Sequence, residues 1–135
     1  MAMSSESSSG RLEWVESFLC PTEFTLAVLG GKWKTVILCY LNQRPCRYSE
    51  LRKLMPAVSD KVLTERLHDL ESSGLIAHRK GGRHAASGTY VLAARGRSLR
   101  DVLHILYRWG HENAGEFHVT VGEPLTALDR DKALR

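Results

Sequence analysis

The sequence lacks long hydrophobic runs, and it contains few cysteines and few aromatic residues. No apolar stretch in its 135 residues approaches the ~20 residues that cross a bilayer, so we expect no membrane association. Its three cysteines form no CxxC pair, and no signal peptide pattern is evident, which together predict a reducing, cytoplasmic location. Hydrophobic residues make up 43% and charged residues 25%, which is typical of one soluble globular domain of this length.

Known catalytic and metal-binding motifs are also missing. The Gly-Gly-Lys run at 30–32 resembles a phosphate loop only superficially, because the Walker pattern needs an earlier Gly and a Ser or Thr where this chain has Trp33. No GxSxG or HExxH occurs, and His104 with His111 offers too few ligands for a metal. A cysteine–histidine nucleophile stays open, because spatial pairing is invisible in a sequence. We therefore expect neither an enzyme nor a bound cofactor.

Positive charge gathers in the middle of the chain. The formal net charge is only +4, which by itself indicates a polyanionic partner weakly. Between Arg44 and Arg95, however, ten basic residues face five acidic ones, so this segment is more positive than the whole chain. Such a distribution favours nucleic acid binding, although an ordinary solvated surface stays an alternative.

Periodicity and capping residues predict a helix-rich chain with one hairpin. A Ser-rich tail (1–10) precedes one domain (11–115), and a tail of uncertain structure follows (116–135). Thr22 and Ser49 are candidate N-caps of two short helices. We expect helices over 11–19, 23–29, 32–42, 49–55, 60–73 and 97–113, and strands over 75–80 and 89–92.

The strongest local signal is a pair of helices joined by the three residues 56–58, the turn length of a helix-turn-helix. Ser59 is the expected N-cap of the second helix, whose N-terminal N–H groups suit a phosphate. A helical wheel places Leu63, Leu67 and Leu70 on one face, where we expect them to pack against the helix at 32–42.

The opposite face of this second helix carries Lys61, Thr64, Glu65 and His68. An α-helix fits the major groove, where Lys61 can neutralise a phosphate or bind guanine and Thr64 can contact a thymine methyl group. His68 can donate to an acceptor, and Glu65 can accept from cytosine, which makes it a candidate specificity residue. The alternative is a solvated helix face without a ligand.

Four basic residues crowd the expected hairpin: Arg79, Lys80, Arg83 and His84. We expect its glycine-rich connection, 81–88, to act as a wing that lies along the DNA backbone or enters the minor groove. The alternative is an ordinary exposed turn.

The last helix has two apolar stripes, the second formed by Val102, Ile105 and Trp109. A small domain has difficulty covering both stripes, so we expect a partner subunit, although a wide core face within one chain stays open. A homodimer would suit a palindromic operator with half-sites one helical turn apart.

Several ordered motifs resemble the HxlR-type family of bacterial transcriptional regulators, relatives of the MarR-type winged-helix proteins. The resemblance implies a mainly α (α+β) winged helix-turn-helix fold. It also implies that the terminal helices form the dimer, so that Trp14, Phe18 and Leu106 join Val102, Ile105 and Trp109 in the interface. It covers roughly residues 20–112 and is carried by Cys-Pro at 20–21, Gly-Gly-Lys-Trp at 30–33, Tyr-Ser-Glu-Leu at 48–51, Ser-Asp-Lys-Val-Leu-Thr at 59–64, the Leu and Gly spacing over 67–76, Gly-Arg-Ser-Leu at 96–99 and Trp-Gly at 109–110.

In some similar proteins the cysteine that matches Cys20 senses oxidants or electrophiles. The dipole of the following helix could lower the pKa of this thiol, whereas nearby Glu23 opposes that effect. The sequence leaves open whether Cys20 is a sensor or a quiet packed thiol. We expect Cys39 in the core and Cys46 in a loop.

Two departures from the family pattern change these expectations. The family's wing usually ends in a Pro-Arg-Val-Glu-Tyr-like stretch, whereas Ala86-Ser87-Gly88-Thr89 precede Tyr90 here and the expected basic residue is missing. Wing contacts should therefore shift to Arg79, Lys80 and Arg83. The tail after Gly115 also runs past the family's usual end. We predict a sequence-specific double-stranded DNA-binding regulator, a cytoplasmic homodimer that associates with the nucleoid and responds to a small molecule or oxidant. The alternative is a winged-helix module that binds another protein, which Glu65 and Asp60 slightly favour.

Overall fold

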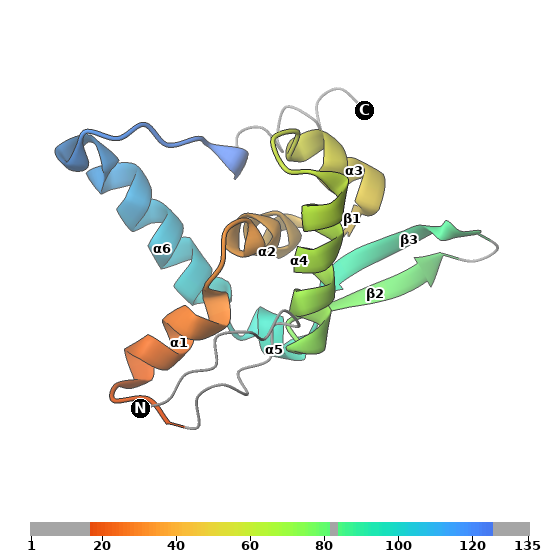
Figure 1. Cartoon of the computed structure of the whole chain (residues 1–135), viewed down its shortest axis with the longest axis horizontal. Helices are drawn as coiled ribbons and strands as arrows, with labels where there is room; N and C mark the ends of the chain where they lie inside the picture. Colours follow the sequence, from red (N-terminus) through yellow and green to blue (C-terminus); the bar gives the residue numbers. More distant parts are fainter. Residues whose placement is uncertain (1–16, 82–83, 126–135) are drawn as a thin grey trace.

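The computed structural model describes residues 17–81 and 84–125 (Figure 1). The expected mainly α (α+β) architecture is confirmed, because helices surround a small antiparallel sheet. The elements in chain order are α1 (Pro21–Leu29), α2 (Lys34–Gln43), β1 (Cys46–Arg47), α3 (Tyr48–Leu54), α4 (Asp60–Ser72), β2 (Ile76–Gly81), β3 (His84–Leu92), α5 (Ala94–Arg97), α6 (Arg100–Asn113) and the 3-10 turn η1 (Ala114–Phe117).

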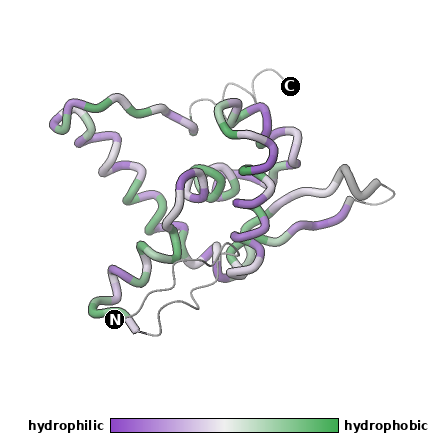
Figure 2. The backbone as a smooth tube through the Cα atoms, viewed as in Figure 1, coloured by the Kyte–Doolittle hydropathy of each residue, from purple (hydrophilic) through white to green (hydrophobic). Residues whose placement is uncertain are grey.

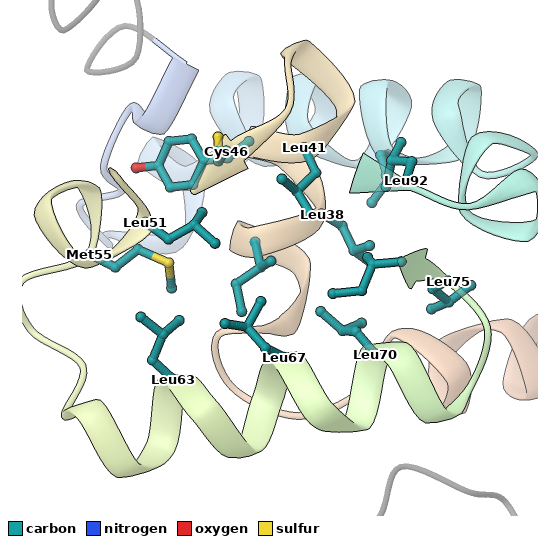
Figure 3. Close-up of a cluster of buried hydrophobic side chains, with 14 of the residues drawn as sticks. Leu38, Leu41, Cys46, Leu51, Met55, Leu63, Leu67, Leu70, Leu75 and Leu92 are labelled. Carbon is teal, nitrogen blue, oxygen red and sulfur yellow. The ribbon is translucent and has the colours of Figure 1, made fainter. Parts of the chain in front are cut away.

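Helix α2 is the centre of the fold, as its nearly continuous apolar sequence predicts. Its Ile37, Leu38, Tyr40 and Leu41 are all buried. Figure 3 shows the leucines of α4 pointing into the cluster that α2 shares with α3 and the strands. Burying one such side chain contributes about 1.5–3 kcal/mol, so this cluster dominates the stability of the domain.

The start of the described chain differs from the prediction in two ways. Residues 17–19 lie in no helix; Phe18 packs edge-on against Phe24 of α1, with ring centroids 5.5 Å apart. The rest of the helix expected over 11–19 falls outside the described residues. Helix α1 begins at Pro21 with Cys20 as its N-cap, so the prediction that Thr22 is the N-cap is wrong. Proline suits the first helical turn because it has no N–H to leave unpaired there.

Helix α2 begins at Lys34, two residues later than predicted, because the preceding loop bends sharply. Gly31 has a φ of 103° and Trp33 a φ of 83°. Glycine adopts the left-handed conformation without steric cost, so Gly31 suits the position that follows the C-cap Gly30.

Helix α3 begins at Tyr48 with Arg47 as its N-cap, so the prediction that Ser49 is the N-cap is wrong. The side chain of Glu50 decides the start: its Oε1 accepts the Arg47 backbone N–H at 3.0 Å. A carboxylate three residues after the N-cap satisfies a donor that the helix cannot.

The sheet has the order β1–β3–β2, and both pairs are antiparallel. Cys46 pairs with Tyr90 and is fully buried, so the expectation of a loop position for Cys46 is wrong. The predicted eight-residue connection is also wrong, because β3 already begins at His84, opposite Gly81. Gly88 permits this pairing: a Cβ there would lie 2.7 Å from the Arg79 carbonyl oxygen.

The last long helix, α6, begins at Arg100, three residues later than predicted, and the short helix α5 precedes it with a break at Ser98 and Leu99. The break follows Gly96, which is buried against the Leu75 backbone with no room for a side chain. After α6 and η1, the chain crosses back toward α3 (Figure 1).

Membrane crossing was tested on the described ranges alone. Within residues 17–81 and 84–125 no single helix is long and apolar enough to span a membrane; α1 and α2 meet the criterion only when joined across their 85° bend, as buried core helices can. The division into a domain over 11–115 and tails on either side stays a prediction.

Candidate nucleic-acid interface

The turn before α4 sets the orientation of that helix. Val58, the last residue of the turn, is buried, and Ser59 confirms its role as N-cap by accepting the Val62 backbone N–H at 3.2 Å. The cap leaves the first turn of α4 at the surface, since both Ser59 and Asp60 are exposed. A helix N-terminus in this position is suited to an anion.

Helix α4 divides cleanly into a buried face and an exposed face. Leu63 and Leu70 are fully buried, and Leu67 nearly so. The four polar residues expected to contact DNA are all exposed, and their spacing places them on one side of the helix: Lys61, Thr64, Glu65 and His68. The structure therefore brings these four side chains together as one solvent-facing surface, which we call the α4 face.

One acidic residue at the start of α4 is held by α3. Arg52 Nε lies 2.9 Å from Asp60 Oδ1, and the Tyr48 hydroxyl donates to the same oxygen at 3.0 Å. Sequence reasoning missed this cluster, because the partners lie eight and twelve residues before Asp60 and meet only across the turn. The interaction neutralises the carboxylate nearest the N-terminus of α4 and links the two helices.

A second basic residue on α4, Arg66, bonds to other groups of the protein and does not face solvent freely. Arg66 Nε donates to the Lys32 carbonyl at 3.1 Å, and its Nη1 lies 3.5 Å from Asp69 Oδ2. Asp69 is only 4% exposed. Arg66 therefore anchors α4 to the loop before α2 and does not extend the α4 face.

The hairpin formed by β2 and β3 projects from the body beside α4 (Figure 1). Arg79 and Lys80 are exposed on β2. The ring of His78 stacks on Tyr90 across the strands, with centroids 4.3 Å apart, which stiffens the base of the hairpin. Arg83 lies outside the described residues, and His84 begins β3.

Exposed apolar side chains gather on α6. Ile105 and Trp109 are 54% and 57% exposed, and Leu106 is also exposed. Hydrophobic and hydrophilic positions alternate along this helix in Figure 2. Val102 was expected beside them but packs against the core, since it lies on the α2 side. Trp14 is outside the described residues, and the half-buried Phe18 covers Phe24 of α1.

The three cysteines have different environments. Cys20 is exposed, and hydrogen bonds from the Thr22 hydroxyl and from the Thr22 and Glu23 backbone lower its pKa, although slight desolvation opposes them. Cys39 is half-buried, and this burial raises the pKa of its thiol. The part of the chain that the structure describes holds no group of three His, Cys, Asp or Glu side chains able to bind a metal ion.

Comparison with known proteins identifies the family. The family described as HxlR-like helix-turn-helix matches residues 28–117. The HTH-type transcriptional regulator YtcD of Bacillus subtilis (strain 168) is 39% identical over 107 residues, which are 79% of this chain and 82% of that protein. YtcD and the other curated relatives are named as transcriptional regulators and not as enzymes.

Solved structures agree with this match. The crystal structure of YtcD has a TM-score of 0.64 and covers 72% of this chain and 99% of its own, at 39% identity. The redox regulator HypR in its reduced form has a TM-score of 0.66 at 30% identity, with 73% of this chain and 98% of that chain covered. The fold is the expected winged helix-turn-helix, with α3 and α4 as the paired helices and β2–β3 as the wing. The chain belongs to the HxlR-like helix-turn-helix family of transcriptional regulators.

Proposed function

We propose that this protein is a sequence-specific double-stranded DNA-binding regulator of transcription that acts as a homodimer. The observation that carries the proposal is the α4 face: four polar side chains exposed on a helix whose opposite side is fully buried. An α-helix with exposed polar groups near its N-terminus fits the major groove, where base edges can be recognised.

The roles along the α4 face follow from chemistry and position. Lys61 lies in the first turn, where its ammonium group can bind a phosphate or guanine. Thr64 and His68 lie one and two turns further, within reach of base edges. Glu65 is the only acidic member, and it would select cytosine because a carboxylate accepts from the cytosine amino group.

The wing supplies a second, less sequence-dependent contact. Arg79 and Lys80 are exposed on β2 beside α4, and His84 begins β3 of the same hairpin. Arg83, which lies outside the described residues, stays a predicted contact of this wing. Cations on a projecting hairpin bind the phosphates that flank a groove, and each such contact makes affinity more dependent on salt.

Dimerisation would cover the apolar side chains exposed on α6, above all Ile105 and Trp109. More than half of each side chain faces solvent, and such a patch beside Leu106 favours contact with another protein surface. A twofold axis through this region would present two copies of α4 to a palindromic operator.

Cys20 is the candidate sensor within this function. It is exposed, and donors from the first turn of α1 stabilise its thiolate, which is the reactive form. HypR is named a redox regulator, and YodB of Bacillus subtilis is known in reduced and quinone-bound forms. We propose that oxidation or alkylation of Cys20 alters DNA binding here.

Binding to a labelled random duplex at two salt concentrations tests the proposal. Affinity should fall by orders of magnitude over a fourfold salt increase, whereas docking of a protein need not respond. Lys61→Ala should weaken binding several-fold; Arg108→Ala is the matched control, because Arg108 is an exposed cation on α6 (Figure 1). Wild-type affinity in the Lys61 variant would contradict the groove assignment and favour a protein-binding module.

The dimer has its own test. Ile105→Glu and Trp109→Glu place a charge on the exposed α6 surface, and each should convert the dimer to a monomer in light scattering. His104→Glu, on the hydrophilic side of the same helix, is the control and should stay dimeric. A monomeric wild-type chain at micromolar concentration would contradict the dimer.

A further inference from the structure

A pocket of about 350 Å³, partly open to solvent, lies between α2, α6 and the chain that follows η1; it is called the cavity below. Val36 and Cys39 of α2 form one wall, and Leu103 and Tyr107 of α6 form the second. Val121 and Pro124 close the third side, and both lie beyond residue 117, where the family match ends. The cavity is therefore completed by a segment outside the part shared with the family.

The closing segment, residues 121–124, is held against the body. His111 Nδ1 of α6 lies 3.6 Å from Glu123 Oε1. On its other side the segment borders Met55 and Pro56 of the helix-turn-helix, across a neighbouring hollow. The segment thus spans from the helix with the exposed apolar surface to the turn that orients α4.

The size of the cavity limits what it can hold. Ligand pockets occupy roughly 300–1,000 Å³, and a buried cavity of about 150 Å³ accommodates benzene. The volume of about 350 Å³ therefore suits a molecule with two fused rings.

The lining offers no opposite charge to a charged ligand. Among the described residues, no Lys, Arg, Asp or Glu lines the cavity, and burial of an unpaired charge is strongly unfavourable. Thr35, Tyr107 and His111 supply a few polar atoms at an otherwise apolar wall, enough to orient one hydroxyl or carbonyl group.

We propose that this cavity binds a small, uncharged, bicyclic aromatic molecule with one hydrogen-bonding group, and that its occupation regulates DNA binding. The regulatory half rests on the proposed function. Helix α2 packs on α4 at one side and on α6 at the other, so the ligand sits between the DNA-facing helix and the proposed dimer surface. A change in α2–α6 packing would alter the separation of the two α4 helices.

Gly110 offers a variant that fills the cavity without disturbing the fold. It lines the cavity on α6, and a Cβ built there meets no atom within 4 Å. Leucine also favours a helix more than glycine does, so Gly110→Leu should fold. Gly115→Leu is the matched control, because Gly115 has equal space around it but lies outside the lining.

The test titrates the full chain with naphthol by calorimetry, and with naphthoate as a charged molecule of the same ring size. We expect saturable binding of naphthol at one site per chain, none of naphthoate, loss in Gly110→Leu and retention in Gly115→Leu. No heat with the wild type overturns the proposal. Equal binding by Gly110→Leu, or a Gly110→Leu chain that changes oligomeric state, overturns it as well.

A gel shift with and without saturating naphthol tests the regulatory half. DNA affinity should change at least fivefold, the lower end of usual couplings, and the Gly110→Leu variant should not respond. Unchanged wild-type affinity overturns regulation. Failure of the ligand-free chain to bind DNA would contradict the proposed function alone, because calorimetry detects the ligand without DNA.

Discussion

The ion pair between Arg52 and Asp60 gives the sharpest prediction about DNA binding. Asp60 stands at the N-terminus of α4, where a phosphate is expected, and Arg52 neutralises it at 2.9 Å. Removal of the arginine leaves a carboxylate whose charge is no longer neutralised, although the Tyr48 hydroxyl still donates to it, and this charge would face the DNA backbone. At a separation of roughly 7 Å in water, two unit charges repel by about 0.6 kcal/mol, which is about threefold in affinity.

The sign of this effect reverses in the partner variant. Arg52→Ala should weaken duplex binding about threefold, Asp60→Asn should strengthen it by a similar factor, and the double variant should return close to wild type. Both single-variant differences should shrink at high salt, since exposed charges are screened. Fluorescence anisotropy with a labelled duplex at three salt concentrations measures each affinity.

The folding stability of each Arg52 and Asp60 variant has to be measured together with its affinity for the duplex. The Asp60 side chain is 78% exposed and that of Arg52 30%, so their pair contributes about 0.2–1 kcal/mol to folding at most. Arg108→Ala, which breaks an exposed pair on α6, is the control and should leave affinity unchanged. Equal weakening in Arg52→Ala and in the double variant would refute the reasoning, because Arg52 would then contact DNA itself.

Three further predictions concern the helix cap, the reactive thiol and the core. Ser59→Ala removes the acceptor for the first turn of α4 and should cost about 1 kcal/mol, seen as a melting temperature lower by about 4 °C in circular dichroism. Because hydrogen bonds from Thr22 lower the Cys20 pKa, the rate at which Cys20 reacts with Ellman's reagent should level off at a lower pH than the rate of a free thiol. Thr22→Val should raise the pH midpoint of this rate profile, and an unchanged midpoint would contradict the assignment. The buried Cys46 should not react before the protein unfolds. Leu67→Ala should reduce the free energy of unfolding in urea by about 2–5 kcal/mol, and a loss below 1 would mean that α4 packs loosely.

The sequence predicted those features that short-range chemistry controls. A serine followed by leucines at helical spacing is enough to begin α4 at Asp60 and to decide which face is buried. The exposure of Lys61 and His68 follows from the same periodicity.

Features that depend on distant partners were not predictable in this way. Ser49 has the chemistry of a cap, yet Glu50 captures the Arg47 N–H and starts α3 earlier. The small residues at 85–88 show no strand pattern, yet β3 runs through them from His84, where the register with β2 shifts between Arg79 and Gly81. The tie from Arg52 to Asp60 likewise needs the turn to be folded first.

Strand β3 connects the two parts of the proposed DNA-binding surface, which are the α4 face and the wing. One edge pairs with β1, which runs directly into α3, and the other pairs with β2, which follows α4. Strand β3 therefore fixes the distance between the α4 face and the wing, the two surfaces proposed to contact a duplex. Each base pair inserted between their positions would shift the second by about 3.4 Å and rotate it by about 35°, so an operator of the wrong length must bend or twist to fit.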